Sequence, residues 1–437
     1  MSNRPKFLLV CLLFVLALFI RFQYIDQLEI DSPIRADAKE YVVYGYNLFH
    51  HGIFSKEFPS AHPRPDSFRS PGYPMLIALC SFIGGEQGLY PVILSLQAVL
   101  SALLVPLTFL VGICIFSEAW AFVAALFVAI SPHLISISGY VLTETLFGFC
   151  LLLSIFFFLR AYLFNSLLMY IFAAFVFGLA YLTNETAFFV PYLLISLVVF
   201  SKRSRVDEKT KVPWRNIFLF LMVFSLFPFS WVLRNNISLS SEVQLNSSRA
   251  ISTLSHGAYP DFIYKTDQYR YIPYCEDPMQ PEFGSSLENF AIIFWERFKQ
   301  RPWRYLSWYL FEKPYYFWSW DILQGQGDVF VYPVKTSLYH KSTLANITRV
   351  FMKGLHPLIL LLTLAGVLFF FYSRCYPLKN HYIHRDCIVF LFIILVYFTG
   401  LYTVFASWSR YSIPLRPELY LFALWSFKNF KQSLMEK

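Results

Sequence analysis

Long apolar runs separated by short polar segments are the dominant pattern along this chain of 437 residues. About 20 apolar residues cross the hydrocarbon core of a bilayer as a helix, and the runs predict about ten such helices. Their approximate bounds are Phe7–Phe22, Tyr90–Phe116, Ala119–Ile135, Tyr140–Leu159, Leu167–Leu182, Ala187–Phe200, Ile217–Val232, Leu355–Tyr372, Ile388–Phe405 and Ser412–Phe427. The apolar segment Tyr73–Ile83 is too short to cross and predicts an interfacial or re-entrant helix. We therefore expect an all-α polytopic membrane protein with external interfacial helices.

The first apolar run, "FLLVCLLFVLALFI", follows Arg4 and Lys6, a pattern that also occurs in signal peptides. A signal peptide would be followed by a cleavage site of small residues, whereas here the chain continues with Arg21, Phe22 and Gln23. We therefore expect the first run to be an uncleaved membrane span.

Basic residues gather in alternate loops between the spans. The groups on one side are Arg4 and Lys6; Arg160; Lys202, Arg203, Arg205, Lys209, Lys211 and Arg215; Arg374, Lys379 and Arg385; and Lys428 and Lys431. Because cytoplasmic loops carry the excess of Lys and Arg, both termini are predicted to be cytoplasmic. Residues 1–234 would then form a transmembrane module with an external loop at 23–70. Residues 235–354 would form a small extracytoplasmic subdomain, and residues 355–437 the C-terminal transmembrane helices.

Composition narrows the class further. The chain is 57% hydrophobic and only 14% charged, unlike a soluble protein of this length. Its net charge of +9 is spread over loops between spans, without an Arg-rich or Gly-rich tract, so we expect no nucleic-acid partner. The seven cysteines include no CxxC pair, and most lie in apolar stretches, so neither a disulfide framework nor a structural zinc site is expected.

Polar residues that are candidates for chemistry all fall on the predicted external side. They are Asp37, Glu40 and Arg69 in the first external loop, Glu144 at the start of the fourth span, Asn184 and Glu185 in the next external turn, Arg234 at the end of the seventh span, and Arg410 in the last external turn. Their convergence at one membrane depth predicts a functional site there.

Several of these residues also have a purely structural interpretation. Asp37 and Glu40 have the spacing of a capping box, and Gly52 is placed to end the same helix. Capping is compatible with catalysis, because a capping residue is rigidly held. One apolar face of this helix, suited to lying on the membrane, would consist of Tyr41, Tyr44 and Leu48.

Glu144 lies within an apolar span, where an ionised side chain costs about 2.5–3.5 kcal/mol even on the lenient insertion scale. Such residues are usually functional, although a shallow position would let the helix N-terminus stabilise the charge. Arg234 and Arg410 are next to or near tryptophans and are alternatively interfacial anchors.

A succession of motifs resembles the GT-C glycosyltransferases. After the acidic first loop come "FRSPGYPMLIAL", "QAVLSALLVPL", "SPHLISISGYVLTETLF", "GLAYLTNET" and "PFSWVLRNN", with a weaker likeness at "SRYSIPLRPELY". The nearest group is the bacterial relatives of the dolichyl-phosphate-mannose protein mannosyltransferases, which include the lipid A aminoarabinose transferases. Two positions depart from the family pattern: Ala38 stands where many members have Glu, and Asn184 where many have Arg or Lys.

The resemblance implies a polyprenyl-phosphate sugar donor that reaches the site from the bilayer. It assigns catalysis to Asp37 and Glu144, with Asp37 as the base that accepts the acceptor hydroxyl's proton and with inversion at the anomeric carbon. Donor phosphate binding is expected from Arg234, Arg410 and Arg69, since guanidinium groups match phosphate oxygens. The other expected substrate-binding residues are Glu40, Tyr41, Tyr73, Asn184 and Asn235. Metal use is left open; a divalent cation, if present, would be shared by Asp37 and Glu144.

Three alternatives stay open: a transporter or flippase of a lipid-linked glycan, a transferase of the O-antigen-ligase type with diphosphate donors, and a non-catalytic family member. The aromatic segment Lys313–Asp328 is expected either to cover the site or to form an interfacial belt. The acceptor is a glycan, lipid or protein, and the resemblance implies a bacterial inner membrane, with the active site on the external face.

Overall fold

The computed structural model describes residues 4–203, 212–239, 249–261, 277, 279–323, 325–375 and 382–435. These residues confirm the all-α fold class. The helices are α1 (Arg4–Gln27), α2 (Asp37–His51), α3 (Gly72–Gly112), α4 (Glu118–Ile130), α5 (Pro132–Ile137), α6 (Glu144–Phe164), α7 (Leu167–Thr183), α8 (Val190–Arg203), α9 (Trp214–Ser238), α11 (Arg249–Gly257), α12 (Gln280–Phe283), α13 (Leu287–Gln300), α14 (Pro302–Ser307), α15 (Lys313–Trp318), α16 (Leu338–Lys341), α17 (Thr343–Cys375), α18 (Tyr382–Val404) and α19 (Arg416–Met435). A short antiparallel pair joins β1 (Glu29–Ile30) to β2 (Val334–Thr336).

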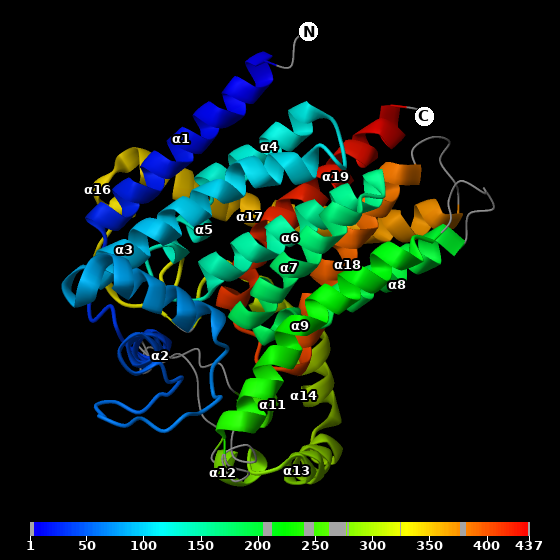
Figure 1. Ribbon diagram of the computed structural model, residues 1–437. Helices are drawn as coiled ribbons and strands as arrows, with labels where there is room; N and C mark the ends of the chain where they lie inside the picture. The colour runs from blue at the N-terminus through cyan, green and yellow to red at the C-terminus, as the bar shows by residue number, and fades with distance from the viewer. Residues whose placement is uncertain are drawn as a thin grey trace.

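Each predicted span overlaps at least one helix, and six of the described helices are long and apolar enough to cross a membrane. These six candidate spans are Leu8–Gln27, Gly72–Gly112, Glu144–Phe164, Trp214–Ser238, Thr343–Phe369 and Asp386–Val404. The start of α1 and the end of α19 lie at the same end of the bundle, and α2, α11, α12, α13 and α14 lie at the opposite end (Figure 1). The described residues therefore form a helical bundle with additional short helices at one end.

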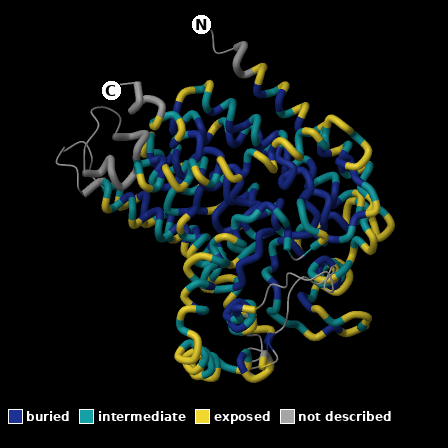
Figure 2. The backbone as a smooth tube through the Cα atoms, turned by 180° about the vertical axis from the view of Figure 1, so that it is seen from behind, coloured by how far each residue is buried: buried dark blue, intermediate teal, exposed yellow. Residues whose placement is uncertain are grey.

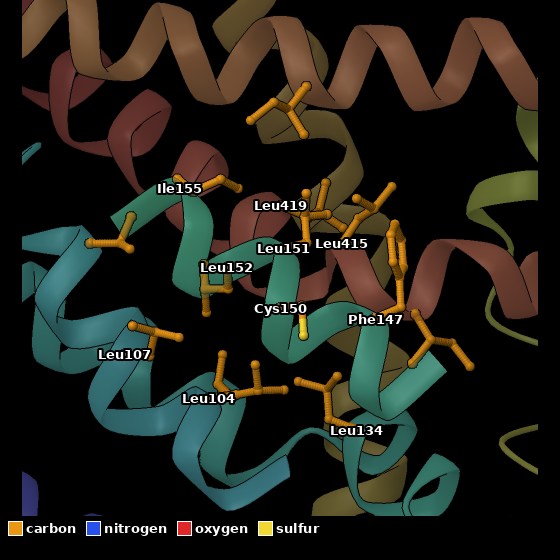
Figure 3. Close-up of a cluster of buried hydrophobic side chains, with 14 of the residues drawn as sticks. Leu104, Leu107, Leu134, Phe147, Cys150, Leu151, Leu152, Ile155, Leu415 and Leu419 are labelled. Carbon is orange, nitrogen blue, oxygen red and sulfur yellow. The ribbon is translucent and has the colours of Figure 1, made fainter. Parts of the chain in front are cut away.

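A continuous apolar core fills the middle of the bundle, and the exposed residues lie on its outside (Figure 2). Figure 3 shows the part of the core where α3, α5, α6 and α19 meet, with Leu107, Leu134, Leu152 and Leu419 among its side chains. Many large apolar side chains on the outer helices are exposed instead; Leu12 of α1, for example, is 57% exposed. Such surfaces are stable against lipid rather than water.

Helix boundaries depart from the predicted ones where polar groups intervene. The predicted span Ala119–Ile135 breaks at Ser131, and the buried Arg21 of α1 donates to the carbonyls of Val128 and Ala129, both at 3.2 Å. These carbonyls stand at the C-terminal end of α4, where helical partners are missing. Arg21 therefore stabilises a helix end inside an apolar run that hydropathy alone presents as continuous.

The predicted short helix at Tyr73–Ile83 forms the first part of α3. Gly85 then interrupts α3 with φ 61° and ψ −173°, a conformation open to glycine but strained for other residues. The helical direction changes there, so the residues before Gly85 form a segment distinct from the span that follows (Figure 1).

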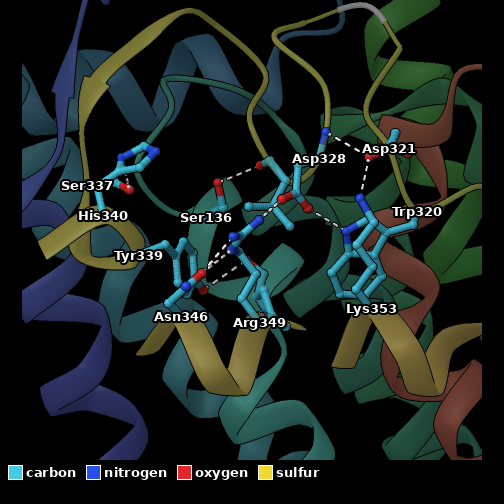
Figure 4. A network of polar contacts seen from close by, with 12 residues as sticks. Ser136, Trp320, Asp321, Asp328, Ser337, Tyr339, His340, Asn346, Arg349 and Lys353 are labelled. Atoms are coloured by element: carbon cyan, nitrogen blue, oxygen red, sulfur yellow. Dashed lines mark hydrogen bonds and ion pairs between the residues drawn. The ribbon is translucent and has the colours of Figure 1, made fainter. Parts of the chain in front are cut away.

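A polar network anchors the segment that precedes β2 (Figure 4). Asp328 pairs with Arg349 of α17 and accepts from the indole N–H of Trp320. Ser136 of α5 donates to the carbonyl of Val329 at 2.6 Å. The segment around Asp328 and Val329 is thereby fixed to two helices of the bundle.

Candidate active site

Two arginines from distant parts of the chain converge on Asp37. Arg69 Nη2 donates to Asp37 Oδ1 at 2.7 Å, and Arg410 Nη2 donates to Asp37 Oδ2 at 2.7 Å. Both guanidinium side chains are less than 10% exposed, whereas the Asp37 side chain is 30% exposed. Burial alone would raise the pKa of Asp37, but Arg410 and Arg69 outweigh that effect and hold the pKa well below its usual range. Asp37 is therefore ionised.

Each arginine contacts a second carboxylate. Arg69 Nε donates to Glu40 Oε2 at 2.6 Å, one turn along α2 from Asp37. Arg410 Nε lies 2.8 Å from Glu144 Oε1 in an ion pair, and Glu144 Oε2 is buried without a hydrogen-bond partner. Glu144 is the first residue of α6, where the helix dipole favours a negative charge. The five side chains form one alternating network of acid and base.

This network contradicts the capping interpretation of Asp37 and Glu40. Asp37 is itself the first residue of α2, and Ala36 before it provides no side-chain cap. Both Asp37 oxygens are bound to guanidinium groups, so they do not turn back to the N–H groups of their own helix. The predicted helix end is confirmed: Gly52 has φ 65° and donates to the carbonyls of Asn47 and Leu48.

The predicted membrane-facing surface of α2 is also wrong. Tyr41 and Tyr44 are buried, Tyr41 lies edge-on to Tyr73 of α3, and Tyr44 donates to Asp66. That face packs against α3 at Tyr41 and against the loop after α2 at Tyr44, and Leu48 is half-buried. The sequence pattern identified a buried face but not what covers it.

The charged network lines a cavity of about 260 Å³. Its polar side includes Asp37, Arg69, Glu144, Asn184 and Arg410. Its remaining wall comes mainly from the η1 turn (Glu185–Ala187), α11 and the C-terminal part of α18, including Phe189, Thr253, Tyr397, Leu401, Tyr402 and Phe405. The cavity is therefore charged on one side and apolar on the other.

Not every predicted site residue reaches this cavity. Tyr41 lines it, and Asn184 lines it while accepting from Thr186 N–H at 3.1 Å. Tyr73 is buried behind Tyr41, where its hydroxyl donates to Gln97 at 2.7 Å. Glu40 supports Arg69 from outside the cavity lining.

Arg234 and Asn235 lie elsewhere. Arg234 Nη1 donates to the carbonyl of Asp66 at 2.6 Å and to Asn235 Oδ1 at 3.0 Å, and Nη2 donates to the carbonyl of Phe54 at 3.2 Å. Arg234 lines a second cavity, which is described below.

A tight backbone contact positions Arg69 beside Asp37. A Cβ on Gly72 would lie 2.8 Å from the carbonyl carbon of Leu182, so only glycine allows the start of α3 to approach the end of α7 this closely. Ser70 donates across the same contact to Glu185. The segments 69–72 and 182–185 together form one wall of the cavity.

The arrangement does not fit a divalent cation shared by Asp37 and Glu144. Such a cation needs carboxylate oxygens that face a common point, but Arg410 lies between the two side chains and contacts both. Among the described residues, no group of three or more His, Cys, Asp or Glu side chains is placed to hold a metal. The positive charge between the two acids comes from the guanidinium.

Sequence reasoning missed four hydroxyl-bearing residues of the cavity lining, Ser70, Thr186, Tyr402 and Tyr411. Ser70, Thr186 and Tyr411 each follow a candidate residue directly (Arg69, Glu185 and Arg410), whereas Tyr402 had no local signal. The aromatic segment Lys313–Asp328 does not line the cavity in the part of the chain that the structure describes; Phe317 and Trp320 are buried in the protein instead.

The fold and the cavity define a polytopic all-α membrane protein with a charged site at one end of its helices. A family model described as dolichyl-phosphate-mannose-protein mannosyltransferase matches residues 62–231. No curated protein matches the chain.

Solved structures share the fold. The oligosaccharyltransferase of Archaeoglobus fulgidus in its apo form has a TM-score of 0.54 at 13% identity, covering 99% of this chain and 51% of that one. The same protein tethered to an acceptor peptide gives a TM-score of 0.53 at 14% identity, covering 99% and 50%. ArnT from Cupriavidus metallidurans bound to undecaprenyl phosphate has a TM-score of 0.40 at 12% identity, covering 99% of this chain and 79% of that one. This structural similarity is too low to support an argument.

The resemblance predicted from the sequence is confirmed: the chain has the fold of the GT-C superfamily of membrane glycosyltransferases. It spans about half the length of the archaeal oligosaccharyltransferase.

Proposed function

We propose that this protein transfers a sugar from a polyprenyl-phosphate donor to an acceptor hydroxyl, with inversion, at the membrane face opposite the chain termini. The observation that carries the proposal is the position of Asp37 between Arg69 and Arg410 on the wall of a half-apolar cavity. The matching family description, which names a dolichyl-phosphate-linked sugar, supports the donor class.

The two sides of the cavity suit the two parts of such a donor. Phe189 and Phe405 lie on the apolar side, and Phe189 is 57% exposed, so this side continues to the lipid-facing surface. A prenyl chain would follow it. Arg69 and Arg410 lie on the other side, where guanidinium groups would bind the phosphate.

The transfer needs one base and one anion site. Asp37 accepts the proton of the acceptor hydroxyl while the hydroxyl oxygen bonds to the anomeric carbon. The bond between that carbon and the phosphate oxygen breaks, and its electron pair leaves on the polyprenyl phosphate, which the arginines stabilise. A single displacement inverts the anomeric centre.

Donor binding would also activate the base. With both oxygens held by arginines, Asp37 is a weak proton acceptor, because its pKa lies below the usual range. A phosphate that engages Arg69 and Arg410 would draw them from Asp37 and raise its basicity. Donor would then bind before the acceptor reacts.

The test is transfer from radiolabelled polyprenyl-phosphate sugars in membranes, with wild type compared with Asp37→Asn at equal expression. We expect label to move into an acceptor with wild type and a loss of about 10²–10⁴-fold in the variant, the usual contribution of a general base. Equal transfer by both would remove Asp37 from the mechanism. Movement of intact labelled lipid across the membrane without transfer would favour the transporter alternative.

A further inference from the structure

A second cavity, of about 510 Å³, lies on the other side of the wall behind Arg69. Pro71 and Leu182 line it, whereas their neighbours Ser70 and Thr183 line the first cavity. The tight contact at Gly72 separates the two. The second cavity is distinct from the catalytic one and shares a wall with it.

The lining of the second cavity is apolar except for one cation. Phe54, Met75 and Trp231 are among its walls, together with two serines, and Arg234 is its only charged residue in the part of the chain that the structure describes. The guanidinium lies over the rings of Phe54 and Trp231, at 5.3 and 5.1 Å from their centroids. It is thus held at one place on an apolar surface.

The positive charge of Arg234 is not neutralised by a hydrogen-bonded carboxylate among the described residues. Its acceptors are the carbonyls of Phe54 and Asp66 and the amide oxygen of Asn235. The Asp66 carboxylate accepts from Tyr44 and from the N–H of Lys56 instead. Arg234 is half-buried, and the Asp66 carboxylate acts on it through space without a hydrogen bond. Because partial desolvation of a cation is costly unless an anion binds it, the site favours an anionic ligand.

The cavity also lies at the lipid-facing surface. Met75 in its wall is 55% exposed, and Leu233, beside Arg234 on α9, is 46% exposed. Helix α9 is a candidate membrane span, Met75 belongs to the short apolar segment of α3 before Gly85, and Trp231 is typical of the level of the lipid headgroups. A ligand would therefore enter from the bilayer.

We infer that this cavity binds one anionic membrane phospholipid, with its phosphate on Arg234 and an acyl chain along Phe54, Met75 and Trp231. The single guanidinium matches the one negative charge of a phosphodiester headgroup, and the described lining contains no acid or histidine to act on a substrate. The bound lipid is therefore a structural ligand and not a substrate, and it packs against the wall that positions Arg69.

Native mass spectrometry of the purified full chain tests this, with phosphatidylglycerol and zwitterionic phosphatidylcholine as probes. Wild type should retain one phosphatidylglycerol about tenfold more strongly than phosphatidylcholine, as one charge-assisted contact allows. Arg234→Gln should lose that selectivity. Arg64→Gln, which removes an exposed arginine from the loop between α2 and α3, should keep it.

A second variant, which fills the cavity, keeps the inference testable if Arg234→Gln misfolds. Ser230 lines the cavity and is exposed, so Ser230→Trp should exclude both lipids while leaving the contacts of Arg234 intact. Equal retention of the two lipids by wild type, or unchanged binding in Ser230→Trp, would overturn the inference. Preferential displacement of phosphatidylglycerol by polyprenyl phosphate would also overturn it, since the cavity would then be a donor site. None of these readouts depends on sugar transfer, so failure of the proposed function would leave them unaffected.

Discussion

Asp37 is the central residue of the site. Its individual partners can be predicted from the sequence, whereas their pairing with it cannot. The individual acids and arginines were identified from their positions near the external ends of apolar runs. The pairing of Asp37 with Arg410 joins residues 373 positions apart, and no local pattern carries that information. The capping pattern was misleading for the same reason: local spacing describes helix starts but not the tertiary partners that compete for a carboxylate.

Phosphate affinity should rise when Asp37 is neutralised, because its carboxylate competes with the donor for Arg69 and Arg410. We expect Asp37→Asn to bind polyprenyl phosphate about tenfold more tightly than wild type, a change of about 1.4 kcal/mol. Titration of the purified proteins with polyprenyl phosphate measures it. Asp31→Asn, an exposed change on the preceding loop, is the control. Weaker binding by Asp37→Asn would show that Asp37 orients the arginines rather than competing with phosphate.

The depressed pKa of Asp37 predicts a pH dependence of stability. A carboxyl whose pKa is lower in the folded state stabilises that state above its unfolded pKa of about 3.9, and this contribution is lost as pH falls through the lower folded value. Burial opposes the shift, but Arg410 and Arg69 dominate. The difference in melting temperature between wild type and Asp37→Asn in detergent should thus be constant from about pH 8 to pH 5 and shrink below about pH 4. A difference that shrinks between pH 7 and 5 would contradict the ionised network.

At the scale of elements, hydropathy predicted the helices well because apolar length is what a bilayer requires. It did not predict the break at Ser131, since the residues on both sides are apolar and the determinant is Arg21 on another helix. It also did not predict the wall between the two cavities, which depends on the absence of a side chain at Gly72.

Replacement of Arg21 should destabilise the break between α4 and α5. Arg21→Met removes the donors to Val128 and Ala129 and leaves buried carbonyls without partners, at a cost of about 1–3 kcal/mol. Thermal unfolding in detergent measures the loss. Arg160→Met is a matched control, because the described contact of Arg160 is with the ring of Phe164 on its own helix. Equal melting temperatures for the two variants would mean that Arg21 does not hold the end of α4.

Gly72→Ala should reduce transfer while leaving the bundle folded. The added Cβ would meet backbone of Leu182, which has no flexible side-chain atom to move aside, so residues 69–72 must shift and carry Arg69 away from Asp37. A 1 Å misplacement in a site of this kind costs about 100-fold in rate. The comparison is Gly88→Ala in the same helix, where the Cβ meets open space. Equal transfer rates in the two variants would show that the close contact at Gly72 does not position Arg69.

At the scale of the whole molecule, the bundle separates its termini from its site. The start of α1 and the end of α19 share one end, and the loop after α2 lies at the other (Figure 1). Most basic loop residues accompany the termini in the predicted topology, so the positive-inside rule predicts that this end is cytoplasmic. The charged cavity would then face outward, on the side where a lipid-linked sugar meets an external acceptor.

Epitope accessibility tests this orientation. A tag inserted at the exposed Ala61 should bind antibody on intact spheroplasts, whereas a tag appended after Lys437 should bind only after the membrane is permeabilised. An unmodified chain and a tagged cytoplasmic protein serve as controls for leakage, and retained sugar transfer shows that the insertion leaves the fold intact. The opposite pattern would place the site in the cytoplasm, and the donor and acceptor would then have to be sought on that side. Access to both tags in intact spheroplasts would place both tags on the same side of the membrane and would contradict the nine spans predicted between residue 61 and the C-terminus.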